Sequence, residues 1–223
     1  MIEAVGFDLD NTLYDQRQHA ANVARAADEW LSKDADLEPG VVERSFVRLW
    51  DALGPSHPKL FDLILESFGL HSLDRRHRLV DLYHIEVGSL DLYPKLRGVL
   101  ERLSVRGPLF LVTDGHVSMQ RKKLVRLGIE GLFHVTVLTA ELNTNKPDPE
   151  PFRHVIQSIG CPAEKVLYVG DNPQCDIAGA LTVGMQAARV LSDPFRNAPL
   201  GFSPTYTLDS ASQVERLLAG TPF

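Results

Sequence analysis

The chain has 223 residues, of which 44% are hydrophobic and 23% charged, and its net charge at pH 7 is −6. This size suits one domain with a large insert or two small domains. Lysine and arginine are scattered along the sequence, so we do not expect a nucleic-acid polymer as a partner. No apolar run has the length of a membrane span, and the first 20 residues carry acids where a signal peptide needs a basic start. We therefore expect a cytoplasmic protein without a membrane partner.

The first predicted strand covers residues 4–7, and two carboxylates, Asp8 and Asp10, follow it. Its residues are apolar, as in a buried strand. If the extended backbone continues through Asp10, both carboxylates project from the same side at the C-terminal end of the strand, where open α/β sheets bind ligands. Acids at a strand exit also serve simply to make turns. These residues by themselves leave both interpretations open.

From residue 18 to residue 88 the apolar residues recur at helical spacing in four stretches. Glycine or proline separates each stretch from the next, as between helices. We therefore predict an inserted four-helix domain over residues 15–91, and a second domain formed by residues 1–14 and 92–223. Trp30 and Trp50 are interpreted as part of the helical core, with a stacking platform for a base as the alternative. The histidines of the insert are interpreted as surface residues: His19, His57, His71, His77 and His84.

Strands and helices alternate through the rest of the chain. Apolar runs predict strands over residues 108–112, 135–138, 166–169, 186–190 and 206–208. Helical spacing predicts helices over residues 96–103, 117–127, 151–159, 176–183 and 212–218. This alternation is typical of a parallel, doubly wound sheet with helices on both faces. The predicted fold class is therefore α/β, with a Rossmann-like core that the helical insert interrupts after the first strand.

Polar residues gather where these predicted strands end. The topology brings the strand ends to one edge of the sheet, beside Asp8 and Asp10. Carboxylates that lie close together repel unless a cation joins them, and Mg2+ prefers oxygen ligands from carboxylates and substrate phosphate. A lysine and a hydroxyl at the same edge would bind the remaining phosphoryl oxygens. The groups concerned are Thr113-Asp114-Gly115, Asn145-Lys146-Pro147-Asp148, Gly170-Asp171-Asn172 and Asp176.

These segments resemble the four motifs of the haloacid dehalogenase (HAD) superfamily, in which phosphatases predominate. The resemblance covers the α/β core in the expected order, and one subclass carries a helical cap where this chain has its insert. Relatives often have Thr-Asn-Gly at the second motif, where this chain has Thr113-Asp114-Gly115. The presence of Gln120 after the second motif also resembles the sequence pattern of the phosphatase branch. The matching residues are Asp8-Leu9-Asp10-Asn11-Thr12 for the first motif, Thr113 for the second, Lys146 for the third, and Gly170-Asp171 with Asp176 for the fourth.

The resemblance implies a Mg2+-dependent hydrolase of phosphomonoesters. Asp8 would be the nucleophile that forms an aspartyl-phosphate, and Asp10 the general acid and then the base. Mg2+ would be held by the side chains of Asp8 and Asp171 and by the main-chain carbonyl of Asp10. Asp176 and Asn172 would lie just outside these ligands, where Asp176 orients Lys146 or the water around the metal. The residues expected to bind phosphate are Asp8, Thr113, Asp114, Gly115 and Lys146.

The expected partner is a small phosphorylated metabolite, a sugar phosphate or a nucleoside monophosphate, bound by a monomer or a homodimer. Related dehalogenases lack the second carboxylate because halide release needs no proton donor, so Asp10 favours phosphoryl transfer. Two alternatives remain: an isomerase of the phosphoglucomutase type, which shares both acids, and a non-catalytic module that binds a phosphometabolite. Candidate substrate-rim residues are Tyr14 and Arg17 at the first hinge, and His116, for which a solvated loop position is the alternative.

Overall fold

The computed structural model describes residues 1–54, 57–85, 88–193, 195–199 and 201–218. The chain divides into two compact units, Met1–Asp15 with Asp91–Phe223, and Gln16–Leu90. The boundaries expected from the sequence lie one residue away from these, and the role of the helical unit as a cap stays a prediction. Among the described residues, no helix combines the length and the apolar character that crossing a membrane requires.

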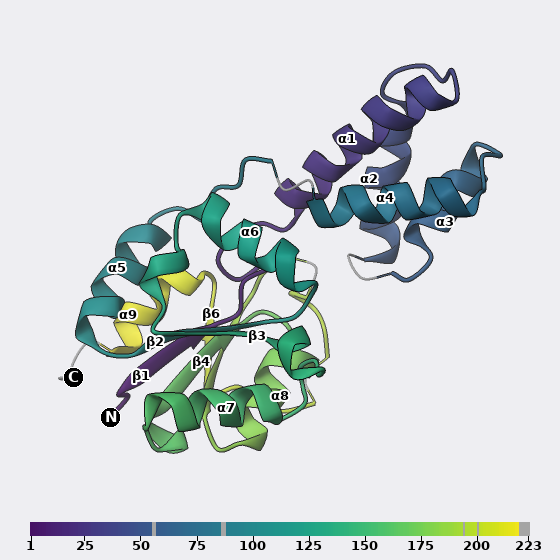
Figure 1. The fold of residues 1–223 in the computed structure, drawn as a ribbon. Coiled ribbons are helices and arrows are strands. Elements are labelled where there is room, and N and C mark those ends of the chain that lie inside the picture. The colour runs from purple at the N-terminus through teal and green to yellow at the C-terminus, as the bar shows by residue number, and fades with distance from the viewer. Residues whose placement is uncertain (55–56, 86–87, 194, 200, 219–223) are drawn as a thin grey trace. The chain divides into compact units, whose positions relative to one another are not determined.

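The larger unit is built on a six-stranded sheet in the order β3-β2-β1-β4-β5-β6, and all neighbouring strands are parallel (Figure 1). Every residue of β1, β2 and β4 is buried, as in a sheet that helices cover on both faces. The expected parallel α/β fold is confirmed. The strands are β1 (Ala4–Phe7), β2 (Leu109–Thr113), β3 (Val135–Leu138), β4 (Val166–Gly170), β5 (Gln186–Val190) and β6 (Tyr206–Leu208).

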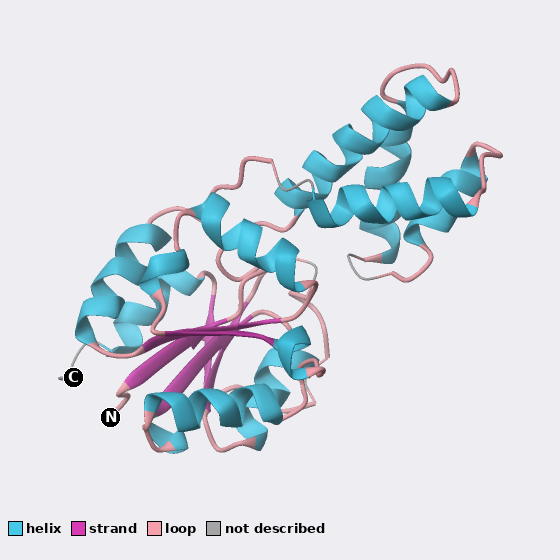
Figure 2. Cartoon of the chain, viewed as in Figure 1, coloured by secondary structure: helices cyan, strands magenta, loops and turns pink. Residues whose placement is uncertain are grey.

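Helices lie on both faces of this sheet (Figure 2). One face carries α5 (Leu96–Arg106), α6 (Val117–Leu127) and α9 (Val214–Leu218), and the other carries α7 (Glu150–Ile159) and α8 (Ala178–Thr182). The helix expected to begin at Asp176 begins instead as a π-helical turn, Pro173–Ile177, before α8. Short 3-10 turns complete the unit: Glu130–Leu132, Thr139–Leu142, Ala163–Lys165 and Ala211–Gln213.

The smaller unit contains the four helices that the apolar spacing predicts. They pack around a common apolar core in which Trp50 is buried, and Trp30 packs against that core. This agrees with the interpretation of both tryptophans as core residues. His19 differs from its expected surface position, because it is buried on α1 with its ring 5.0 Å from the ring of Tyr83. The helices are α1 (Arg17–Asp34), α2 (Val41–Leu53), α3 (Leu60–Ser67) and α4 (Leu73–Ile85).

Gly6 sets how closely β1 and β2 pack next to the site. It is paired in register with Phe110, and a Cβ atom on Gly6 would lie 1.9 Å from the Phe110 ring. The Phe110 ring in turn stacks on Tyr168 with a centroid separation of 6.1 Å. Only a residue without a side chain at this position leaves room for the Phe110 ring.

We expect Gly6→Ala to lower the free energy of unfolding by about 1–3 kcal/mol, because the added methyl group overpacks the ring. Thermal unfolding followed by circular dichroism measures the effect. Gly131→Ala is the matched control, since no atom lies within 4 Å of a Cβ placed there. Equal unfolding midpoints for the two variants would contradict this packing argument.

Candidate active site

Asp8 lies directly after β1, at the C-terminal end of a central strand. Its backbone N–H donates to the carbonyl of Val169 at 2.9 Å, which continues the pairing with β4 for one residue. The chain then turns, with Asn11 in the left-handed region at φ 60°. This turn brings the Thr12 hydroxyl to 3.1 Å from Asp8 Oδ2, to which it donates. The side chain of Asp8 is buried, and this hydrogen bond holds it in one orientation.

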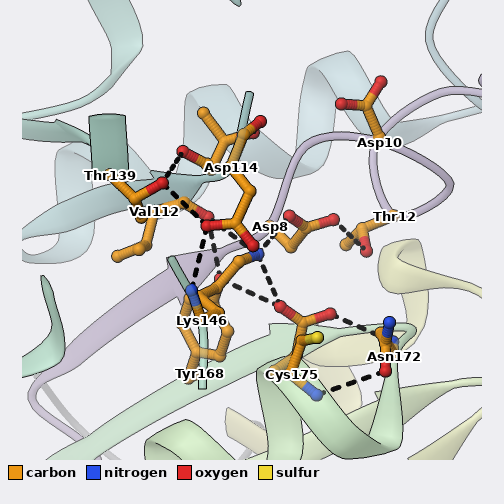
Figure 3. A network of polar contacts seen from close by, with 12 residues as sticks. Asp8, Asp10, Thr12, Val112, Asp114, Thr139, Lys146, Tyr168, Asn172 and Cys175 are labelled. Atoms are coloured by element: carbon orange, nitrogen blue, oxygen red, sulfur yellow. Dashed lines mark hydrogen bonds and ion pairs between the residues drawn. The ribbon is translucent and has the colours of Figure 1, made fainter. Parts of the chain in front are cut away.

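Lys146 reaches the same place from the loop after β3. Its Nζ lies 2.6 Å from Asp8 Oδ1 and 2.6 Å from Asp176 Oδ1, so one buried ammonium joins two buried carboxylates (Figure 3). It also lies 6.0 Å from the centre of the Tyr168 ring. The Tyr168 hydroxyl donates to the carbonyl of Val112 at 2.9 Å. Sequence reasoning missed Tyr168, because a tyrosine in a buried strand reads as core.

Asp114 holds the loop that carries Lys146. Its Oδ1 accepts hydrogen bonds from the Thr139 hydroxyl at 2.7 Å and from the backbone N–H of Lys146 at 3.0 Å (Figure 3). The carboxylate thus links the ends of β2 and β3 to the third motif. Thr139 was not expected at the site, and nothing in the spacing of the sequence distinguishes it from a strand-end threonine.

Three buried carboxylates, Asp8, Asp171 and Asp176, place oxygen atoms within 4.8 Å of one another. The Ser192 hydroxyl donates to Asp171 at 2.8 Å, and the backbone N–H of Asn172 donates to Asp176 at 3.0 Å. Gly170 permits this arrangement, because a Cβ atom there would lie 2.5 Å from Asp176. The side chain of Asn172 accepts from the backbone of the π-helical turn, so it caps that turn.

The charges in this cluster are only partly balanced. Burial raises the pKa of Asp8 to about 7, and the charge of Asp176 adds to this against the opposing charge of Lys146. Burial, together with the charges of Asp176 and Asp8, raises the pKa of Asp171 well above its usual range. Burial alone would lower the pKa of Lys146, but the two carboxylates beside it raise that pKa. A hard divalent cation suits such a set of oxygen donors, because it would supply the missing positive charge.

Asp10 is separate from this cluster and points away from Asp8 (Figure 3). Its Oδ1 accepts hydrogen bonds from the Tyr14 hydroxyl and from Lys123 Nζ, and its Oδ2 accepts one from Gln120. Burial would raise the pKa of Asp10, but the charge of Lys123 and these hydrogen bonds hold it below its usual value. Tyr14, expected at the substrate rim, is instead fully buried with its hydroxyl on Asp10.

The other expected residues lie as follows. The Thr113 hydroxyl is buried and accepts a hydrogen bond from the Gln120 amide at 2.6 Å. Gly115 has a φ of 119°, which favours glycine in the turn before α6.

His116 is exposed in that turn, with its Nδ1 3.0 Å from the Ser118 hydroxyl. Arg17 is exposed on α1 and forms an ion pair with Asp51 at 3.3 Å. The roles of His116 and Arg17 stay predictions.

The chain is similar to known phosphatases. It is 34% identical over 199 residues to the glyceraldehyde 3-phosphate phosphatase of Methanopyrus kandleri, which covers 85% of this chain and 84% of that protein. It is also 34% identical over 138 residues to the phosphoserine phosphatase of Thermus thermophilus, over 61% of this chain and 55% of that protein.

The fold is also similar to solved structures. A 2-haloacid dehalogenase from Pseudomonas syringae pv. tomato superposes with a TM-score of 0.69 and 28% identity over 99% of both chains. The family model that describes haloacid dehalogenase-like hydrolases matches residues 2–184. This match covers the sheet strands β1 to β4 and all four motif segments, and it confirms the resemblance inferred from the sequence. The chain therefore belongs to the haloacid dehalogenase-like hydrolases.

Proposed function

We propose that this hydrolase is a Mg2+-dependent phosphatase that cleaves the phosphomonoester of a small metabolite through an aspartyl-phosphate on Asp8. The observation that carries the proposal is the buried Asp8 carboxylate, which has Lys146 Nζ at 2.6 Å and the Thr12 hydroxyl at 3.1 Å. Fixed donors hold a nucleophile in place, and a buried lysine beside it supplies positive charge where phosphoryl oxygens would bind. The phosphatases among the relatives support the same reaction.

In the first half of the proposed reaction, one carboxylate oxygen of Asp8 attacks phosphorus while the bond from phosphorus to the leaving oxygen breaks. The leaving oxygen takes a proton from the carboxyl group of Asp10 and departs as an alcohol. Lys146 and the Thr113 hydroxyl would bind the phosphoryl oxygens, together with the turn that follows Thr113. Asp114 acts indirectly, because its carboxylate is already occupied in holding the Lys146 loop.

In the second half, water attacks the phosphorus of the aspartyl-phosphate and gives a proton to the Asp10 carboxylate. The bond between phosphorus and the Asp8 oxygen breaks, which releases inorganic phosphate and restores the Asp8 carboxylate. Asp10 then carries the proton that the next leaving group needs. The two halves therefore require opposite protonation states of the same residue.

The proposed Mg2+ would be held by the side chains of Asp8 and Asp171 and by the main-chain carbonyl of Asp10. The excess of buried carboxylates over lysine at this place supports the assignment. When bound, Mg2+ would offset the negative charge of the phosphoryl group. Asp176 would keep its contact with Lys146 and so hold the ammonium beside Asp8.

The proposed substrates are small phosphorylated metabolites, including sugar phosphates and nucleoside monophosphates. Relatives are named for glyceraldehyde 3-phosphate, phosphoserine and pyrimidine nucleotides, which share a phosphomonoester and differ in the leaving group. An isomerase of the phosphoglucomutase type would return the phosphoryl group to a second hydroxyl. Sustained release of free phosphate distinguishes hydrolysis from that alternative.

We expect wild-type protein with Mg2+ to release phosphate from at least one member of a panel of sugar phosphates, nucleoside monophosphates and phosphorylated hydroxy acids. Asp8→Asn should abolish this release, because an amide cannot form the aspartyl-phosphate. Inorganic phosphate measured by a colorimetric assay gives the readout. Asp209→Asn, which changes an exposed carboxylate of the same unit, should retain wild-type turnover. Phosphate release by Asp8→Asn at the wild-type rate would exclude Asp8 as the nucleophile.

We also expect Mg2+ to raise the unfolding midpoint more at pH 8 than at pH 5. The pKa values of Asp8 and Asp171 are raised in the folded protein, so their contribution to stability is present below about pH 4 and is lost as the pH rises through the folded values, about 7 for Asp8. A cation binds the ionised form and offsets this loss. At 100 times its dissociation constant, a ligand stabilises by about 2.7 kcal/mol, which is several degrees in midpoint.

Thermal unfolding with MgCl2, against NaCl of equal ionic strength, measures this shift. Asp171→Asn should lose the response to Mg2+, because it removes the side chain of one proposed ligand. The control Asp209→Asn should respond as wild type does. A shift that is equal at both pH values, or that persists in Asp171→Asn, would contradict the metal assignment.

A further inference from the structure

Ser192 is a half-buried serine to which the reaction described above gives no role. It follows β5 by two residues, and its hydroxyl donates to Asp171 Oδ2 at 2.8 Å. Asp171 directly follows β4, the strand beside β5, and Gly170 is paired in register with Arg189. The contact therefore joins the C-terminal ends of two neighbouring parallel strands.

The two carboxylate oxygens of Asp171 have different surroundings. Oδ2 accepts the hydrogen of the Ser192 hydroxyl, whereas Oδ1 has no hydrogen-bond donor among the residues that the structure describes. The carboxylate faces the cluster, because one of its oxygens lies within 4.8 Å of oxygens of Asp8 and Asp176. A hydroxyl has one hydrogen to donate, and by donating it here Ser192 fixes the rotation of the carboxylate. Asp171 therefore offers one uncommitted oxygen to a cation.

The loop that carries Ser192 is held in place on both sides. The buried Arg189 donates from its Nη2 to three carbonyls of the loop, those of Phe195, Arg196 and Ala198. Within the described part of the chain Arg189 forms no ion pair, so these carbonyls compensate for the burial of its guanidinium. Gln174, in the π-helical turn before α8, donates to the carbonyl of Pro199 at 3.1 Å. The Ser192 hydroxyl thus acts from a fixed segment.

The number of oxygens that a carboxylate offers affects which divalent cation it suits. Mg2+ demands nearly ideal octahedral geometry, whereas Ca2+ accepts more oxygens in a flexible arrangement and often takes both oxygens of one carboxylate. A carboxylate with a fixed rotation and one oxygen already occupied suits Mg2+ better than Ca2+. A hydrogen-bond partner of a metal ligand typically changes metal affinity by about 10–100-fold.

We propose that Ser192 is a positioning residue that fixes Asp171 with a single oxygen available to the cation, and that it thereby favours Mg2+ over Ca2+ at this site. The inference rests on the proposed function, in which Asp171 holds the metal. Ser192 lies outside residues 2–184, which the family model matches. The contact with Asp171 therefore carries the inference, and the family pattern does not.

The test measures cation binding in the absence of substrate. Wild type, Ser192→Ala and Ser192→Thr are titrated with MgCl2 and separately with CaCl2 by isothermal titration calorimetry, at pH 8 and constant ionic strength. We expect Ser192→Ala to raise the dissociation constant for Mg2+ about tenfold or more and that for Ca2+ less than about threefold, because the freed carboxylate can offer both oxygens. Ser192→Thr keeps the hydroxyl and should keep the wild-type ratio of the two constants.

The matched control is Ser158→Ala on α7. It removes an exposed hydroxyl that donates to the carbonyl of His154, and it should bind both cations as wild type does. A merely structural loss weakens both cations alike, so an unchanged ratio of the two constants in Ser192→Ala would overturn the inference. A Ser192→Thr variant with the ratio of Ser192→Ala would overturn it as well.

The same titrations separate this inference from the proposed function. Wild-type protein that binds neither Mg2+ nor Ca2+ contradicts the metal assignment of the proposed function, and the role of Ser192 with it. Wild-type protein that binds Mg2+, together with a Ser192→Ala variant that keeps the wild-type ratio, contradicts only the role of Ser192.

Discussion

The site depends on one interaction, the buried contact of Lys146 with Asp8 and Asp176. Each of these three charges would be costly to bury alone, and the ammonium at 2.6 Å from both carboxylates compensates for part of that cost. The three residues follow β1, β3 and β4 along the chain, so the contact requires the sheet order that the structure shows. Asp114 anchors the Lys146 loop, and Gly170 leaves the space that Asp176 occupies.

That contact leaves the cluster with an excess of negative charge. Lys146 offers one positive charge to three buried carboxylates, and the contact of the Asp171 side chain is with the neutral Ser192 hydroxyl among the residues that the structure describes. The raised pKa values of Asp8 and Asp171 express this imbalance. In the proposed function a cation and a phosphoryl group would use these incompletely compensated charges, which cost the free protein some stability. The same uncompensated charges would therefore bind these ligands and lower the stability of the free protein.

The sequence predicts the strands and the residues at their ends well, because buried parallel strands are short apolar runs and their ends are marked by Asp, Thr and Gly. It predicts less well the residues that act from inside the core. Tyr168 looks like any aromatic strand residue, and its contact with Lys146 depends on the fold. Lys123 lies four residues from Met119 and from Leu127, a spacing that places it on the buried stripe, but a lysine beside Arg121 and Lys122 is ordinarily read as solvated. The π-helical turn before α8 leaves no periodic signal in five residues.

Two aspartates that are two residues apart in sequence lie in opposite environments. Burial and a neighbouring carboxylate raise the pKa of Asp8, whereas Lys123 and two neutral donors lower that of Asp10 below its usual value against the effect of burial. Two acids with separated pKa values can take different roles in one reaction. Two buried lysines produce the separation: Lys146 is shared between two carboxylates, and Lys123 serves one. The three donors to Asp10 hold its carboxylate in a direction away from Asp8 in the free protein, so each proton transfer proposed for Asp10 requires these contacts to loosen.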